Sequence, residues 1–69
     1  MNEKLERLIE EMVAKGIRFA DASREFERRF ISRVLAGSDG NLSRAAGVLG
    51  IHRNTLSRKM AEHRLKRRP

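Results

Sequence analysis

Apolar side chains recur every three or four positions through most of the 69-residue chain, and this spacing predicts helices. Five glycines and one proline divide the pattern into helix-length intervals, and none of them shows the alternation typical of a strand. The first predicted helix covers about residues 3–15, has one apolar stripe and stops at Gly16. The second opens near Asp21 or Ser23, both favourable N-caps, and runs to Gly37.

Two shorter helices follow the polar turn at residues 37–40. Asn41 is a natural N-cap, and the apolar positions 42, 45, 46 and 49 predict a helix of about two turns that ends before Gly50. A fourth helix after Ile51 directs Leu56 and Met60 inward. The sequence therefore predicts an all-α chain of four helices.

The spacing around Gly50 is typical of a helix-turn-helix. Ala46 is small enough to let a second helix approach, and Gly50 can leave the helix in a left-handed conformation without Cβ strain. Ile51 and Leu56 then fill the angle between the two helices. A short helical hairpin built only for packing shares part of this pattern.

The outward face of the fourth helix favours DNA over simple packing because it is basic and rich in hydrogen-bonding groups. Arginine matches the guanine edge, asparagine the adenine edge, and hydroxyl groups reach phosphates or bases. The candidates for the major groove are Arg53, Asn54, Thr55, Ser57 and Arg58. At the start of the third helix, where free backbone N–H groups favour phosphate, Asn41, Ser43 and Arg44 are assigned to the DNA backbone.

The charge distribution supports this division. Sixteen basic and nine acidic residues give a net charge of +7, which favours a polyanionic partner. Residues 1–40 are neutral in sum, so the whole excess lies in residues 41–69. We therefore expect dimerisation helices in residues 1–40, a DNA-binding unit in 41–63 and a basic tail in 64–69. The tail is expected to attract phosphate non-specifically, and specific DNA contacts by Lys66, Arg67 and Arg68 stay open.

The stretch GNLSRAAGVLGIHRNTLSRKM closely resembles the Fis family, which includes the C-terminal domains of NtrC-like sigma-54 activators. The match covers about residues 24–63. It implies a homodimer of four-helix subunits that pairs through the first two helices, inserts both final helices into successive major grooves and bends the DNA. The DNA contacts that it implies fall on Asn41, Ser43, Arg44, His52, Arg53, Thr55 and Lys59. His52 departs from the asparagine of Fis, and the recombinase-stimulating arms of Fis are not expected in this chain.

A dimer also follows from the residues themselves. A core built from the last three helices leaves the stripe of the first helix uncovered, and a second copy related by two-fold symmetry would cover it. The two recognition helices would then read half-sites roughly 34 Å apart. The expected interface consists of Leu5, Leu8, Ile9, Met12, Val13, Phe19, Phe26 and Phe30. Ile17 and Phe19 are expected to be buried, and Met12, Met60 and the three phenylalanines are expected in the core.

Other functional classes find little support in the sequence. The chain has no cysteine, and His52 and His63 have no acidic or thiol ligand set close in sequence, so no metal is expected. The serines lack a histidine-carboxylate pairing, which argues against an enzyme. No apolar run is long enough for a membrane span, and the glutamates of the first helix disfavour anionic lipid. We also expect no cofactor and no small-molecule ligand.

The expected function is sequence-influenced binding of double-stranded DNA as a homodimer in the bacterial cytoplasm, at the nucleoid. The output would be transcriptional regulation or DNA bending. Two alternatives remain: an isolated C-terminal domain of a sigma-54 activator, and, from another class, a helical protein-interaction adaptor with a basic tail.

Overall fold

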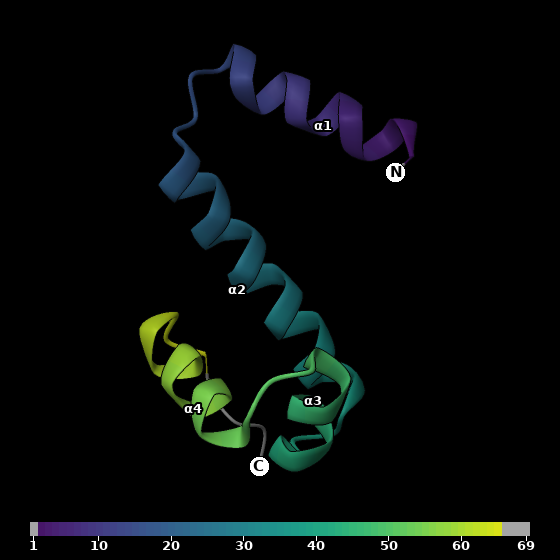
Figure 1. Cartoon of the computed structure of the whole chain (residues 1–69), viewed down its shortest axis with the longest axis vertical. Helices are drawn as coiled ribbons and strands as arrows, with labels where there is room; N and C mark the ends of the chain where they lie inside the picture. The colour runs from purple at the N-terminus through teal and green to yellow at the C-terminus, as the bar shows by residue number, and fades with distance from the viewer. Residues whose placement is uncertain (1, 66–69) are drawn as a thin grey trace.

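The computed structural model describes residues 2–65 and confirms the all-α prediction (Figure 1). Its helices are α1 (Glu3–Ala14), α2 (Phe19–Gly37), α3 (Leu42–Leu49) and α4 (Arg53–Glu62). None of the helices among these residues is long and apolar enough to cross a membrane. The predicted basic tail lies outside the described residues, except for Arg64 and Leu65.

Local side-chain caps explain where two of the helices begin. The Asn2 side chain accepts a hydrogen bond from the Leu5 N–H at 3.0 Å, and Asn41 accepts one from the Arg44 N–H at 3.0 Å. The start of α2 differs from the prediction, because its N-cap is Arg18, which makes no side-chain cap. Asp21 therefore lies inside the first turn of α2, where its charge still favours the helix dipole.

The hydrophobic core joins α2, α3 and α4, as the sequence predicts. Each of the three helices contributes buried side chains, and Leu56 of α4 is completely inaccessible. Ala45 and Ala46 are also buried, and their small side chains let α3 pack closely between its neighbours. The buried set is Ile31, Leu35, Leu42, Ala45, Ala46, Leu56 and Met60.

Helix α1 stands apart from this core. In Figure 1 it runs away from the far end of α2, while α3 and α4 gather at the other end. No residue of α1 is buried. The radius of gyration is 13.8 Å, against about 11 Å for a compact chain of this length, so the subunit is extended.

Several side chains predicted to be buried are exposed in the single subunit. Phe19, Phe26 and Phe30 are exposed, and Ile17 is too, so the expectation that they lie within the subunit core is wrong. Met12 is half-buried, whereas Met60 is in the core as predicted. The reason is geometric: the three phenylalanines lie on α2 and Ile17 lies in the α1–α2 connection, and no further helix of residues 2–65 covers them.

These exposed side chains form one apolar groove between α1 and α2. The groove has a volume of about 1100 Å³ and extends to Leu49 at the end of α3 and to Ile51 in the turn before α4. Of the eight predicted interface residues, all but Val13 line it. We call this surface the α1–α2 groove.

Candidate nucleic-acid interface

The turn between α3 and α4 has the geometry predicted around Gly50. The Gly50 backbone is left-handed, with φ of 72°. Its N–H donates to the Gly47 carbonyl at 3.2 Å, and the Ile51 N–H donates to the Ala46 carbonyl at 3.1 Å. These two bonds form a Schellman motif, which satisfies the free carbonyl groups at the end of α3 and redirects the chain.

His52 is the N-cap of α4. Its ring nitrogen Nδ1 accepts a hydrogen bond from the Asn54 N–H at 3.0 Å. Any ring proton must therefore sit on Nε2, because Nδ1 is the acceptor. A histidine at this position still caps the helix, and it leaves Nε2–H as an exposed donor at the start of α4.

Most of the predicted DNA-contacting side chains are accessible. Thr55 and Lys59 are half-buried. The exposed members are Asn41, Ser43, Arg44, His52, Arg53, Asn54, Ser57 and Arg58. They lie at the N-termini of α3 and α4 and along the outer side of α4.

Among the described residues, the three exposed arginines of this surface have no acidic partner. Within residues 2–65 the ion pairs involve Arg29 with Glu25, Lys59 with Glu27, and His63 with Glu27. Arg44, Arg53 and Arg58 therefore present uncompensated guanidinium groups. Such groups are suited to phosphates and to guanine edges because they donate two parallel hydrogen bonds.

Comparison with known proteins decides the family. Residues 22–63, more than half of the chain, match the family described as "Bacterial regulatory protein, Fis family". The chain belongs to the Fis family. The matched residues of this Fis-family chain include α3, α4 and nearly all of α2, and so contain the whole predicted helix-turn-helix.

Two curated relatives from Xylella fastidiosa carry the name "Putative Fis-like DNA-binding protein". The relative from strain Temecula1 is 50% identical over 42 residues, which cover 61% of this chain and 47% of the relative. The relative from strain 9a5c is 49% identical over 41 residues, which cover 59% of this chain and 46% of the relative. The match thus spans slightly less than half the length of each relative. No solved structure matches the chain.

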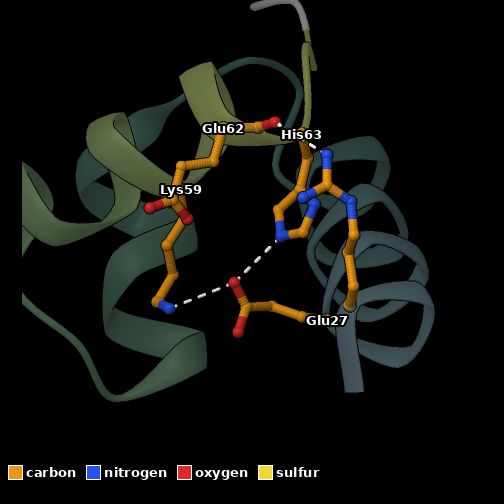
Figure 2. A network of polar contacts seen from close by, with 5 residues as sticks. Glu27, Lys59, Glu62 and His63 are labelled. Carbon is orange, nitrogen blue, oxygen red and sulfur yellow. Dashed lines mark hydrogen bonds and ion pairs between the residues drawn. The ribbon is translucent and has the colours of Figure 1, made fainter. Parts of the chain in front are cut away.

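One polar cluster of this Fis-family chain has no signal in the sequence pattern (Figure 2). A single carboxylate oxygen of Glu27 on α2 accepts from Lys59 Nζ at 3.0 Å and lies 2.9 Å from His63 Nε2. The pKa of Glu27 is held below its ordinary value, first by the hydrogen bond to His63 and then by the one to Lys59. Lys59, predicted to touch DNA, therefore has its ammonium group on α2 in the free subunit.

The cluster also places Glu27 near His63, 36 residues away in the sequence, beside the neighbouring Glu62. Glu27, Glu62 and His63 bring ligand-type atoms within 4.8 Å of one another. The Lys59 ammonium already occupies the same Glu27 oxygen, and its positive charge would repel a metal ion. We therefore interpret these residues as an ion-pair network between α2 and α4.

Proposed function

We propose that this protein binds double-stranded DNA as a homodimer and that it regulates transcription or bends DNA, without catalysing a reaction. Membership of the Fis family and the names of the two curated relatives support DNA binding. The observation that carries the proposal is the uncompensated cationic surface on a helix-turn-helix. It implies that the protein acts in the bacterial cytoplasm, where the DNA is.

The exposed side chains suggest two kinds of DNA contact. Arg53, Asn54 and Ser57 lie in the first two turns of α4, the part of a recognition helix that reaches base edges. Asn41, Ser43 and Arg44 lie at the N-terminus of α3, where backbone N–H groups and the helix dipole favour phosphate. In the proposal the first group reads sequence and the second holds the protein in register on the duplex. The exposed His52 and Arg58 join this surface, and Thr55 is its half-buried member.

The α1–α2 groove supports the homodimer. Large apolar side chains seldom lie together on the surface of a monomer, and contiguous patches of this kind mark interaction sites. The groove is lined by the residues that the sequence assigns to a two-fold interface, among them Leu8, Phe26 and Phe30. A second copy would bury them and would place two copies of α4 on the same side of the dimer.

Titration of a labelled duplex at several salt concentrations tests DNA binding. If the protein makes several phosphate contacts, the logarithm of its association constant should fall steeply and linearly with the logarithm of salt concentration. Selection of bound sequences from a random duplex pool should return two half-sites about one helical turn apart. No preference for duplex over other polyanions would refute the proposal and favour the protein-interaction adaptor.

Two variants separate the two parts of the proposal. Arg53→Ala should weaken binding by about 1–3 kcal/mol at the preferred sequence and relax selectivity, if Arg53 reads a base. Equal weakening on all sequences would instead place Arg53 on phosphate. Leu8→Asp introduces a charge into the α1–α2 groove and should give a monomer in analytical ultracentrifugation. An unchanged mass would show that α1 is not the interface.

A further inference from the structure

One carboxylate on α2 connects to two successive turns at the end of α4. Figure 2 shows Lys59 and His63 converging on a single oxygen of Glu27, from positions 32 and 36 residues further along the chain. Lys59 lies in the last turn of α4, and His63 is its C-cap. The two contacts therefore tie the C-terminal end of the proposed recognition helix to the long helix α2.

His63 makes this connection specific. Its side chain is only 3% exposed, and its Nδ1 has no hydrogen-bond partner among the described residues. An ionised carboxylate can only accept a hydrogen bond, so His63 Nε2 must carry a proton and donate a hydrogen bond to Glu27. A buried N–H that loses its acceptor is destabilising. Glu27 is thus the one hydrogen-bond partner that the structure gives to the ring at the end of α4.

A second contact from α2 acts on the same turn. Arg24, three residues before Glu27, donates from Nη2 to the Glu62 carbonyl oxygen at 3.5 Å. The last carbonyl groups of a helix carry partial negative charge, so a guanidinium group there is favourable. Helix α2 therefore meets the end of α4 with one acidic and one basic side chain one turn apart.

From these contacts we infer that Glu27 is a positioning residue for DNA binding, which fixes α4 against α2 through Lys59 and His63 without touching the duplex. The inference rests on the proposed function and deepens it. Helix α2 also carries Phe26 in the α1–α2 groove, so the orientation of α4 on α2 sets where the recognition helix lies relative to the proposed two-fold axis. We call the contacts of Glu27 with Lys59 and His63 the brace. In the complex with DNA, the Lys59 ammonium group stays on Glu27 as part of this brace.

The direction in which one substitution changes duplex affinity distinguishes a positioning role from an electrostatic one. Glu27→Ala removes a negative charge, so attraction to phosphate alone would leave duplex binding unchanged or make it tighter. Loss of the brace instead reduces the fraction of chains with α4 correctly placed, and the apparent affinity falls with that fraction. We expect Glu27→Ala to bind duplex with roughly one tenth of the wild-type affinity. The slope of its affinity against salt concentration should be unchanged.

Asp21→Ala is the control for the change of charge. Asp21 lies on the same helix, is exposed and joins no ion pair of residues 2–65, but it lies outside the α1–α2 groove, whereas Glu27 and Lys59 both line it. It makes the same change of charge and should bind duplex as tightly as the wild type or more tightly. Sedimentation of each variant checks that the association state is unchanged. A Glu27→Ala chain that has lost the dimer would show that Glu27 acts through the interface, and would overturn the positioning role.

Lys59→Met provides a second measurement that does not leave the buried ring unpaired. If Lys59 belongs to the brace, this variant should keep the wild-type salt slope, and adding it to Glu27→Ala should cause little further loss. A salt slope reduced by about one would place Lys59 on a phosphate in the complex and would overturn the inference. Nitrogen spectra of the His63 ring should show a hydrogen-bonded Nε2 in the wild type, and the resonance of this nitrogen should shift when Glu27→Ala removes the acceptor.

The outcomes separate the two proposals. A wild-type protein that binds no duplex refutes the proposed function and this role with it. A wild-type protein that binds duplex, together with Glu27→Ala that binds as well as Asp21→Ala, refutes the positioning role alone.

Discussion

Truncation of Phe26 to alanine is the sharpest test of the apolar groove. Phe26 is 64% exposed in the subunit and lines the groove, and its ring centroid lies 5.3 Å from that of Phe30. A buried aromatic side chain contributes roughly 150–250 Å², so covering the exposed part removes roughly 100–160 Å² from water. At about 25 cal/mol per Å² this is worth about 2.5–4 kcal/mol in each subunit.

A two-fold dimer contains this contribution twice, so Phe26→Ala should raise the dissociation constant by at least roughly a hundredfold. Sedimentation equilibrium over a range of concentrations measures the change. Val48→Ala is the control, because Val48 is 68% exposed on α3 and does not line the groove. Equal dissociation constants for the two variants would refute the assignment of the groove to a second copy.

The remaining predictions concern the subunit itself. Leu56→Ala should destabilise the fold by about 2–5 kcal/mol in chemical denaturation, because Leu56 is completely buried and leaves a cavity. Gly50→Ala should cost about 1–2 kcal/mol from its left-handed backbone alone, since a Cβ there meets no atom within 4 Å. Arg64 follows the C-cap of α4 and has a left-handed backbone with φ of 55°, so Arg64→Gly should stabilise the fold by about 0.5–1 kcal/mol, measured as a higher melting temperature. Because the folded-state pKa of Glu27 lies below its ordinary value of 4.5, its contribution to stability is complete above that pH and is lost as the pH falls through the lowered pKa. Acid denaturation of Glu27→Gln should therefore show a shallower loss than the wild type.

The sequence predicts well those features that depend on neighbours along the chain. Asn41 caps α3 and Gly50 ends it, because both act through hydrogen bonds or backbone angles within a few residues. The core positions of α3 and α4, such as Ala46 and Leu56, follow from helical spacing in the same way. A local signal is less decisive where several residues compete, so α2 begins at Phe19, ahead of the favourable caps.

Features that join distant parts of the chain could not be obtained from the pattern. The sequence shows that Phe19 and Phe26 are apolar and expects them to be covered, but it does not say whether the same chain or another one covers them. Glu27 and His63 are 36 residues apart, and two single polar residues leave no periodic trace. Their contact depends on how α2 and α4 pack, which only the three-dimensional structure specifies.

Because no residue of α1 is buried in the subunit, the folding of α1 should depend on protein concentration. A lone helix of 12 residues is marginal in water, because the cost of nucleation is shared by few hydrogen bonds. In the proposed dimer α1 gains its order from the partner, so dilution would melt this segment while the core around Leu56 stays folded. Helicity per residue, measured by circular dichroism, would then report the association equilibrium directly.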